Sequence, residues 1–215
     1  MSRRAPPDQC PGPLRFITIR RGTRLWRVHA AHRAATTMNS TPHPHASSGG
    51  RFDSLDGSCA YLYAGGSIQA AVAETLTRDL PLDGTPRLLP RSALAHRRLS
   101  ELQVNRALRL VALHGPGLAA VGQDTWLTKC EARDYPLTRR WAAAIRRWAP
   151  QAVGFVYRCR HDEDEFAYVF FAPPEVSECP FLSVTGTCVD LDTPVGHLLV
   201  RAVLTRYNAT LARDR

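Results

Sequence analysis

Lysine is almost absent from this chain of 215 residues. Lys129 is the only lysine among 28 lysine and arginine residues, so arginine supplies nearly all of the basic charge behind the formal net charge of +9. Arginine stays charged when partly buried and binds phosphate through two parallel hydrogen bonds. The charge therefore fits a nucleic acid, a phosphorylated small molecule or an acidic protein as partner. A genome that favours arginine codons would give the same composition, so the charge alone does not identify the partner.

Long apolar runs are also lacking, and no stretch approaches the roughly 20 residues of a membrane span. The beginning, MSRRAPPDQCPGP, has two arginines without an apolar stretch after them, so we expect no secretory signal. The six cysteines are scattered without a close pair, which indicates neither a disulfide framework nor a zinc site. We expect a cytoplasmic protein with reduced thiols, no membrane contact and no metal.

The patterns that are present predict one α+β domain with two flanking segments. Residues 1–13 are polar and rich in proline, and we expect them to be disordered. Residues 14–175 alternate strand-like and helical patterns and form the predicted domain. Residues 176–215 have a looser composition, with a possible helix over 195–211, and form an extension of unknown role.

Two patterns within the domain are clear. Residues 153–157 and 166–171 are apolar runs of strand length around a charged tip, which predicts a hairpin. Residues 134–150 predict an amphipathic helix. We expect its four arginines to form a solvated face, with an acidic partner or a nucleic acid as the alternative; they are Arg139, Arg140, Arg146 and Arg147.

The stretch 48–80 is the candidate for chemistry. A glycine pair precedes Arg51, and a strand over 60–64 places Tyr61 and Tyr63 on one face. Ser67 is the expected N-cap of a helix over 68–80. The apolar stripe of this helix lies far from Glu74; it consists of Ile68, Val72, Leu76 and Leu80.

The residues alone leave ordinary roles open. Glu74 and Arg78 are four apart, so a solvated ion pair worth a few tenths of a kcal/mol would explain both. The two tyrosines could be core aromatics, and Arg51 could be a loop cation. Arg27, in the predicted strand 24–29, could be an edge-strand charge. The pattern itself therefore predicts a candidate pocket and no more.

Several segments together resemble the RES domain, the toxin of a bacterial toxin–antitoxin family named for its arginine, glutamate and serine. They are LWRVH (25–29), GGRFD (49–53), YLYAGGSIQAAVAETL (61–76), RRWAAAI (139–145) and GFVYRCRHD (154–162). The likeness covers residues 24–172. It implies a compact α+β fold similar to the ADP-ribosyltransferase toxins, with a mixed sheet core, surrounding helices and a cleft for NAD+.

The resemblance also assigns site residues. It implies catalytic roles for Glu74, Arg51 and Cys159, and NAD+ binding by Arg27, Arg51, Tyr63 and Tyr61. Cys159 stands where the family has its serine, so the chain departs from the family pattern there. These residue types suit the cleavage of NAD+. Breaking the nicotinamide–ribose bond builds oxocarbenium character on the sugar, and a carboxylate stabilises it. Arginines can clamp the pyrophosphate, and an aromatic ring can stack on nicotinamide.

We therefore expect a RES-type toxin that breaks down NAD+ by hydrolysis or phosphorolysis. We also expect an Xre-like antitoxin as partner and no direct binding of nucleic acid. One alternative is an ADP-ribosyltransferase that modifies a protein. An alternative of another class is a non-catalytic, arginine-rich module that binds nucleic acid or an acidic protein.

Overall fold

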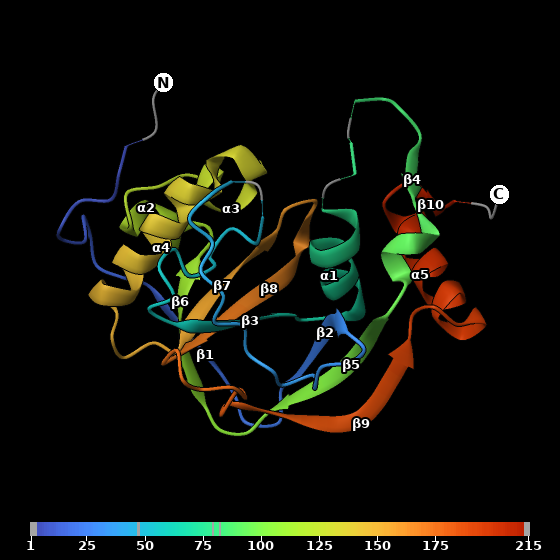
Figure 1. Cartoon of the computed structure of the whole chain (residues 1–215). Coiled ribbons are helices and arrows are strands. Elements are labelled where there is room, and N and C mark those ends of the chain that lie inside the picture. The colour runs from blue at the N-terminus through green and yellow to red at the C-terminus, as the bar shows by residue number, and fades with distance from the viewer. Residues whose placement is uncertain (1–3, 47, 79, 82, 213–215) are drawn as a thin grey trace.

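One eight-stranded mixed sheet organises the chain (Figure 1). The computed structural model describes residues 4–46, 48–78, 80–81 and 83–212. In spatial order the strands are β1 (Phe16–Ile19), β6 (Leu108–Leu113), β7 (Gly154–Cys159), β8 (Asp162–Ala172), β3 (Ala60–Gly65), β2 (Arg24–Ala30), β5 (Arg97–Val104) and β9 (Leu182–Asp190). Neighbouring strands are antiparallel except β6 and β7, which are parallel. The sheet confirms the expected α+β class.

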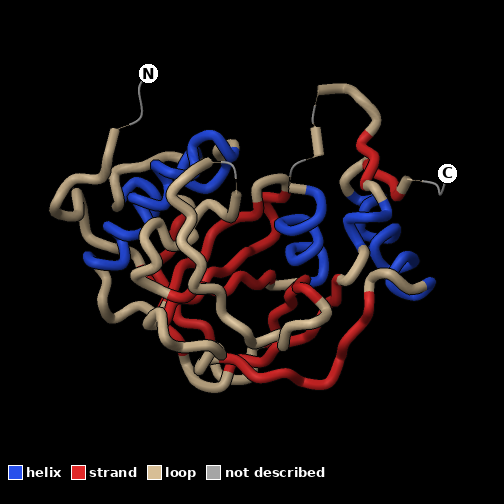
Figure 2. The backbone as a smooth tube through the Cα atoms, in the orientation of Figure 1, coloured by secondary structure: helices blue, strands red, loops and turns tan. Residues whose placement is uncertain are grey.

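The helices lie in two groups with strands between them (Figure 2). One group holds α2 (Pro116–Ala120), α3 (Trp126–Lys129) and α4 (Tyr135–Trp148). The other holds α1 (Ile68–Val72), continued by the π-helical turn η1 (Ala73–Thr77), and α5 (Pro194–Arg206). Short 3₁₀ turns cover Arg91–Leu94 and Ala132–Asp134, and β4 (Arg87–Leu89) pairs in parallel with β10 (Ala209–Leu211).

Each helix group has its own core against the sheet. Trp141 and Ile145 of α4 pack with Phe155 of β7. Val72 of α1 packs with Val200 of α5 in a separate cluster, together with residues of β2 and β5. The opposite face of the sheet carries a third cluster. Two helix layers on one long sheet leave a region between them where a site can form.

The hairpin and the helix predicted within the domain are confirmed, as β7–β8 and α4. Two strands of the main sheet were not predicted, β5 and β9, and β10 lies within the stretch 195–211 that was expected to be helical. β5 reads RRLSELQV and β9 reads LSVTGTCVD, and most of β9 is exposed at the sheet edge. In the edge strand β9, small polar residues hide the alternation, because its outer side need not be apolar. β5 lies inside the sheet, and its charged residues Arg97, Arg98 and Glu101 interrupt its apolar pattern.

The two segments set apart in the sequence are attached to the domain. β9 joins the main sheet and α5 packs against α1, so the described part of 176–215 belongs to the same structure. Residues 4–13 form no helix or strand, yet they are held by hydrogen bonds. The indoles of Trp141 and Trp148 donate to the carbonyls of Arg4 and Asp8, at 3.1 and 2.9 Å. These two bonds attach the segment to α4.

The helix after β3 begins as predicted, because the Ser67 hydroxyl caps it by accepting from the amide of Ala70 at 3.0 Å. The predicted helix 68–80 ends at Thr77, after a π turn. Its start packs closely on β3, where a Cβ at Gly65 would lie 2.4 Å from the amide nitrogen of Ala71. Gly65 therefore sets how near the helix comes to the strand.

We predict that Gly65→Ala lowers the free energy of unfolding by roughly 2 kcal/mol, as overpacking does in a filled core. Gly66→Ala is the matched control, since a Cβ there would meet the carbonyl oxygen of Phe166 at an ordinary 3.4 Å. Urea unfolding of the two variants measures the difference. Equal midpoints would show that the helix shifts freely on β3.

Candidate functional site

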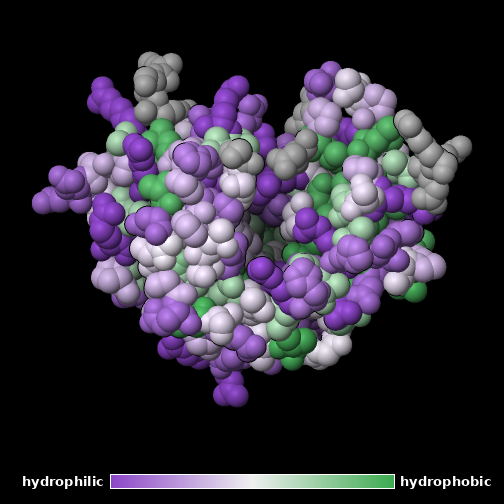
Figure 3. Space-filling model, viewed as in Figure 1, coloured by the Kyte–Doolittle hydropathy of each residue, from purple (hydrophilic) through white to green (hydrophobic). Residues whose placement is uncertain are grey.

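A cavity of about 310 Å³ opens between α1, β3 and the loop before β3. The surface is hollowed near its centre, with hydrophilic residues around the opening (Figure 3). Five of the predicted site residues line this cavity: Arg27, Arg51, Tyr61, Tyr63 and Glu74. They come from β2, the loop before β3, β3 itself and η1, so the fold brings together segments that are far apart in the chain.

A buried ion pair lies at the centre of the site. The guanidinium nitrogen Nη1 of Arg51 is 3.5 Å from Oε2 of Glu74. Their side chains are 2% and 14% exposed. Glu74 is thus mostly withdrawn from solvent, whereas a surface ion pair would leave it solvated.

Two further donors hold the Glu74 carboxylate. The backbone amide of Arg160 donates to Oε1 at 2.6 Å, and the Tyr157 hydroxyl donates to Oε2 at 3.3 Å. Glu74 lies in the π turn, a rare geometry that is frequent at functional sites. The carboxylate is therefore fixed on both oxygens before any ligand binds.

Arg51 is enclosed by aromatic rings. Its guanidinium carbon lies 5.7 Å from the ring centre of Tyr135 and 5.9 Å from that of Tyr157. Burial is the largest single influence and acts to lower the pKa of Arg51, but Glu74 together with Tyr157, Tyr135 and Cys130 outweighs it, and the net pKa is raised. Nε and Nη2 have no hydrogen-bond partner among the described residues. Arg51 is thus a permanent buried cation with two unpaired donors, and its positive charge beside the cavity suits an anionic ligand.

Arg27 lies in an interior strand, because β2 pairs with both β3 and β5. The edge-strand reading of this arginine is therefore wrong. Its Nη1 donates to the carbonyls of Ala35 and Thr37, at 2.6 and 2.8 Å. Burial lowers its pKa to about 10, which still leaves it charged at neutral pH. Arg27 both fixes the segment after β2 and presents charge to the cavity.

The two tyrosines are tied into the loop before β3. Tyr63 donates its hydroxyl hydrogen to Oδ1 of Asp53 at 2.7 Å and accepts from the amide of Phe52 at 2.9 Å. Tyr61 accepts from the Asn39 amide group at 2.8 Å. Burial raises the pKa of both tyrosines, so both hydroxyls stay protonated. Both line the cavity from β3, and Tyr61 also belongs to a buried core cluster against which Tyr63 packs.

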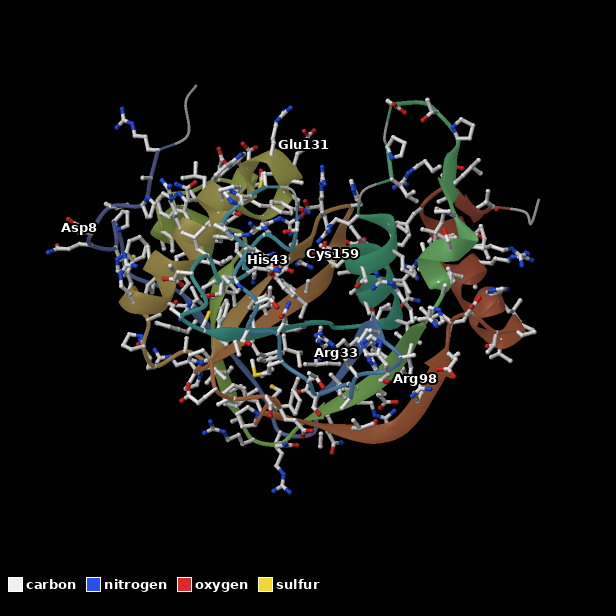
Figure 4. The ribbon with its side chains drawn as sticks, viewed as in Figure 1. Asp8, Arg33, His43, Arg98, Glu131 and Cys159 are labelled. Carbon is white, nitrogen blue, oxygen red and sulfur yellow. The ribbon has the colours of Figure 1, made fainter. Side chains whose placement is uncertain are left out.

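Cys159 lies at the end of β7 (Figure 4) and is fully buried. Its side chain is outside the set that lines the cavity. Burial, with the Glu74 carboxylate next, raises the pKa of the thiol, so the reactive thiolate is disfavoured. The backbone that follows it does reach the site, through the amide of Arg160. This segment therefore contacts Glu74 by its main chain.

Sequence reasoning missed three residues of the site. Tyr157 and Asp53 lie inside the segments that carry the resemblance, but no pattern distinguishes them from ordinary neighbours. Arg139 was expected on the solvated face of α4, and that expectation is wrong, because it is fully buried. The available signal was its spacing, since Arg139 lies three residues before the buried Ala142 and shares its face.

Arg139 binds the loop that carries Arg51. Its guanidinium donates to four backbone carbonyls of that loop, those of His43, His45, Ser48 and Gly50. The hydroxyl of Thr138 donates to the carbonyl of Arg51 itself at 2.6 Å. One turn of α4 thus supplies hydrogen-bond donors to backbone carbonyls of this loop, which would otherwise be buried without a partner.

A model of the RES domain family matches residues 24–192, most of the chain. The chain therefore belongs to the RES domain family. A solved structure with a similar fold is a chain of the crystal structure of the M. tuberculosis MbcT–MbcA toxin–antitoxin complex. The two are 23% identical with a TM-score of 0.58, over 86% of this chain and 92% of that chain. No protein with curated annotation matches.

No helix among the described residues is long and apolar enough to cross a membrane. Within the same residues, no group of three or more histidine, cysteine, aspartate or glutamate side chains could hold a metal ion.

We predict that Arg139→Gln lowers the free energy of unfolding by about 3 kcal/mol or more, because hydrogen bonds to a charged group are lost and buried carbonyls are left unpaired. Arg140→Gln is the matched control, since Arg140 is the next residue of the helix and is exposed. Chemical denaturation of both variants gives the comparison. Similar midpoints would mean that water replaces the guanidinium without cost.

Proposed function

We propose that the protein is a RES-type toxin that breaks down NAD+ by cleaving the nicotinamide–ribose bond, with water or phosphate as acceptor. The buried pair of Arg51 and Glu74 facing the cavity is the observation that carries this proposal. The family resemblance supplies NAD+ as the substrate. The geometry supports it, because the cavity combines a fixed carboxylate with arginines.

Glu74 is the group that acts on the reacting sugar. Departure of nicotinamide leaves positive charge on the ribose, and a carboxylate already oriented by three donors stabilises that charge without reorganising. The same carboxylate can orient the attacking oxygen on the ribose. No covalent bond to the protein is needed, which agrees with the burial of Cys159.

The pyrophosphate is the part of NAD+ that the arginines would bind. Arg51 supplies buried positive charge with two unpaired donors, and Arg27, Arg78 and Arg97 also line the cavity. The cavity volume of about 310 Å³ lies at the lower end of the usual range for ligand sites, about 300–1,000 Å³. We infer that it encloses the nicotinamide riboside end and that the adenosine lies over the rim.

The partner in this proposal is an antitoxin of the Xre type, in the cytoplasm. It rests on family membership and on the solved toxin–antitoxin complex whose fold this chain shares. A protein that consumes NAD+ freely would harm its own cell, so a partner that restrains it belongs to the proposal.

Incubation of the purified protein with NAD+, followed by chromatography of the products, tests the activity. Release of nicotinamide with free ADP-ribose indicates hydrolysis, and a phosphate-dependent product indicates phosphorolysis. ADP-ribose attached to added cell proteins would identify a transferase instead. Intact NAD+ together with salt-dependent binding of nucleic acid would replace the proposal by the non-catalytic alternative.

Glu74→Gln is expected to reduce NAD+ turnover by about 100-fold or more, because it removes the charge that acts on the transition state. Glutamine has the same size, but it leaves Arg51 without its buried partner charge, so the variant should be less stable and its turnover is measured where it is shown to be folded. Glu131→Gln is the control, a glutamate whose side chain is 59% exposed on the surface. Near-normal turnover by Glu74→Gln would refute the proposed site.

Cys159→Ser and Cys159→Ala should both keep turnover within about fivefold of the wild-type value, because the side chain does not line the cavity. Both results follow from a buried thiol that is not a nucleophile. In the folded protein, iodoacetamide should label the exposed Cys188 long before Cys159. Loss of all turnover in a folded Cys159→Ser protein would show that the sulfur takes part in the reaction.

A further inference from the structure

The single lysine of the chain lies directly behind the site. Lys129 ends α3, and its ammonium group donates to the backbone carbonyls of Cys159 and Arg160, the latter at 3.3 Å. Its Nζ also lies 2.7 Å from Oε1 of Glu163. An ammonium has three hydrogens, and these three acceptors use all of them. The side chain is 18% exposed and does not line the cavity.

The two carbonyls belong to the backbone that reaches Glu74. The register of β7 with β8 shifts between Arg158 and Cys159, so the ladder is irregular here. The amide of Arg160 donates to Oε1 of Glu74 at 2.6 Å. The Cys159 carbonyl and the Arg160 amide belong to the same rigid peptide plane, so a group that fixes this carbonyl also fixes the direction of the N–H.

We propose that Lys129 is a positioning residue for Glu74, which holds the backbone of residues 159–160 so that the amide of Arg160 orients the carboxylate. This inference rests on the proposed function, because Glu74 acts there as the group that stabilises the transition state. Lys129 touches neither the substrate nor Glu74; it acts through the peptide between Cys159 and Arg160. In Figure 4, Glu131, two positions after Lys129 in the sequence, lies at the outer side of the molecule, and Cys159 lies nearer its centre.

The kinetic signature of this role differs from that of substrate binding. A misdirected carboxylate weakens stabilisation of the transition state, while the pyrophosphate contacts of the arginines remain. Lys129→Met keeps a long apolar stem and loses the ammonium. It should lower kcat by about 10- to 100-fold, as for one hydrogen bond to a charged group, and leave KM nearly unchanged.

Two variants serve as controls. Lys129→Arg keeps a cation with several donors and should retain most of the wild-type kcat. Glu163→Gln removes the carboxylate partner of Lys129, whose side chain is 70% exposed, and should change kcat by no more than about twofold, because exposed ion pairs contribute little. A loss in Glu163→Gln as large as that in Lys129→Met would contradict the path through the carbonyls.

Selective chemistry tests the same role in the unaltered sequence. Amine-specific acetylation can reach only Lys129 and the chain terminus, because the protein has no other lysine. Acetylation should lower the kcat of the wild-type protein and spare Lys129→Arg treated in parallel. Equal losses in both proteins would assign the effect to the terminus and overturn the proposal. This arm remains informative if Lys129→Met fails to fold.

A readout without turnover separates this proposal from the proposed function. The amide proton of Arg160, bonded to a carboxylate, should resonate downfield and exchange slowly in nuclear magnetic resonance spectra. Both features should weaken in Lys129→Met and in Glu74→Gln. If the wild-type protein leaves NAD+ intact, the proposed function fails and these spectra still decide the geometry. An unchanged Arg160 amide in folded Lys129→Met protein would overturn the positioning role.

Discussion

The buried ion pair between Arg51 and Glu74 is the constraint on which the site depends. Removing a charge from water costs several kcal/mol, and a partner must be held close to offset that cost. Here the cation comes from a loop and the anion from the π turn after α1, so neither segment can settle without the other. The close approach of α1 to β3 at Gly65 serves the same requirement, because it fixes where the π turn lies.

Each charge has its own support on the side away from the cavity. Arg139 and Thr138 of α4 hold the carbonyls of the loop around Arg51, and Asp53 ties the amide of Gly50 to the Tyr63 hydroxyl. A side chain at Gly49 would collide with Asp53, since its Cβ would lie 2.4 Å from Oδ2. The glycine pair is thus needed for close contact between a loop and the carboxylate that braces it.

The residues that line the cavity were predictable to the extent that they lie in local patterns. The stripe of α1 placed Glu74 away from the apolar core, and the alternation of β3 put Tyr61 and Tyr63 on one face. What holds them was not predictable, because it depends on contacts between distant segments. The Arg160 amide and Glu74 are separated by 86 positions, and Arg139 and Gly50 by 89. An amphipathic pattern also cannot tell a solvated arginine from one that binds buried carbonyls, which is why Arg139 was misplaced.

The parts of the fold that hold Arg51 and Glu74 have different roles in the proposed site. The loop side, held from α4, presents a cation with open donors, and such contacts act on bound substrate as well as on the transition state. The helix side, held by Tyr157 and by the backbone next to Lys129, fixes the carboxylate that in the proposed reaction faces the positive charge on the ribose only while the glycosidic bond breaks. Binding and bond cleavage therefore depend on different parts of the fold, which meet at a single ion pair. A substitution in α4 would affect the proposed reaction by shifting Arg51. A substitution of Lys129 in α3 would affect it by turning the peptide group between Cys159 and Arg160.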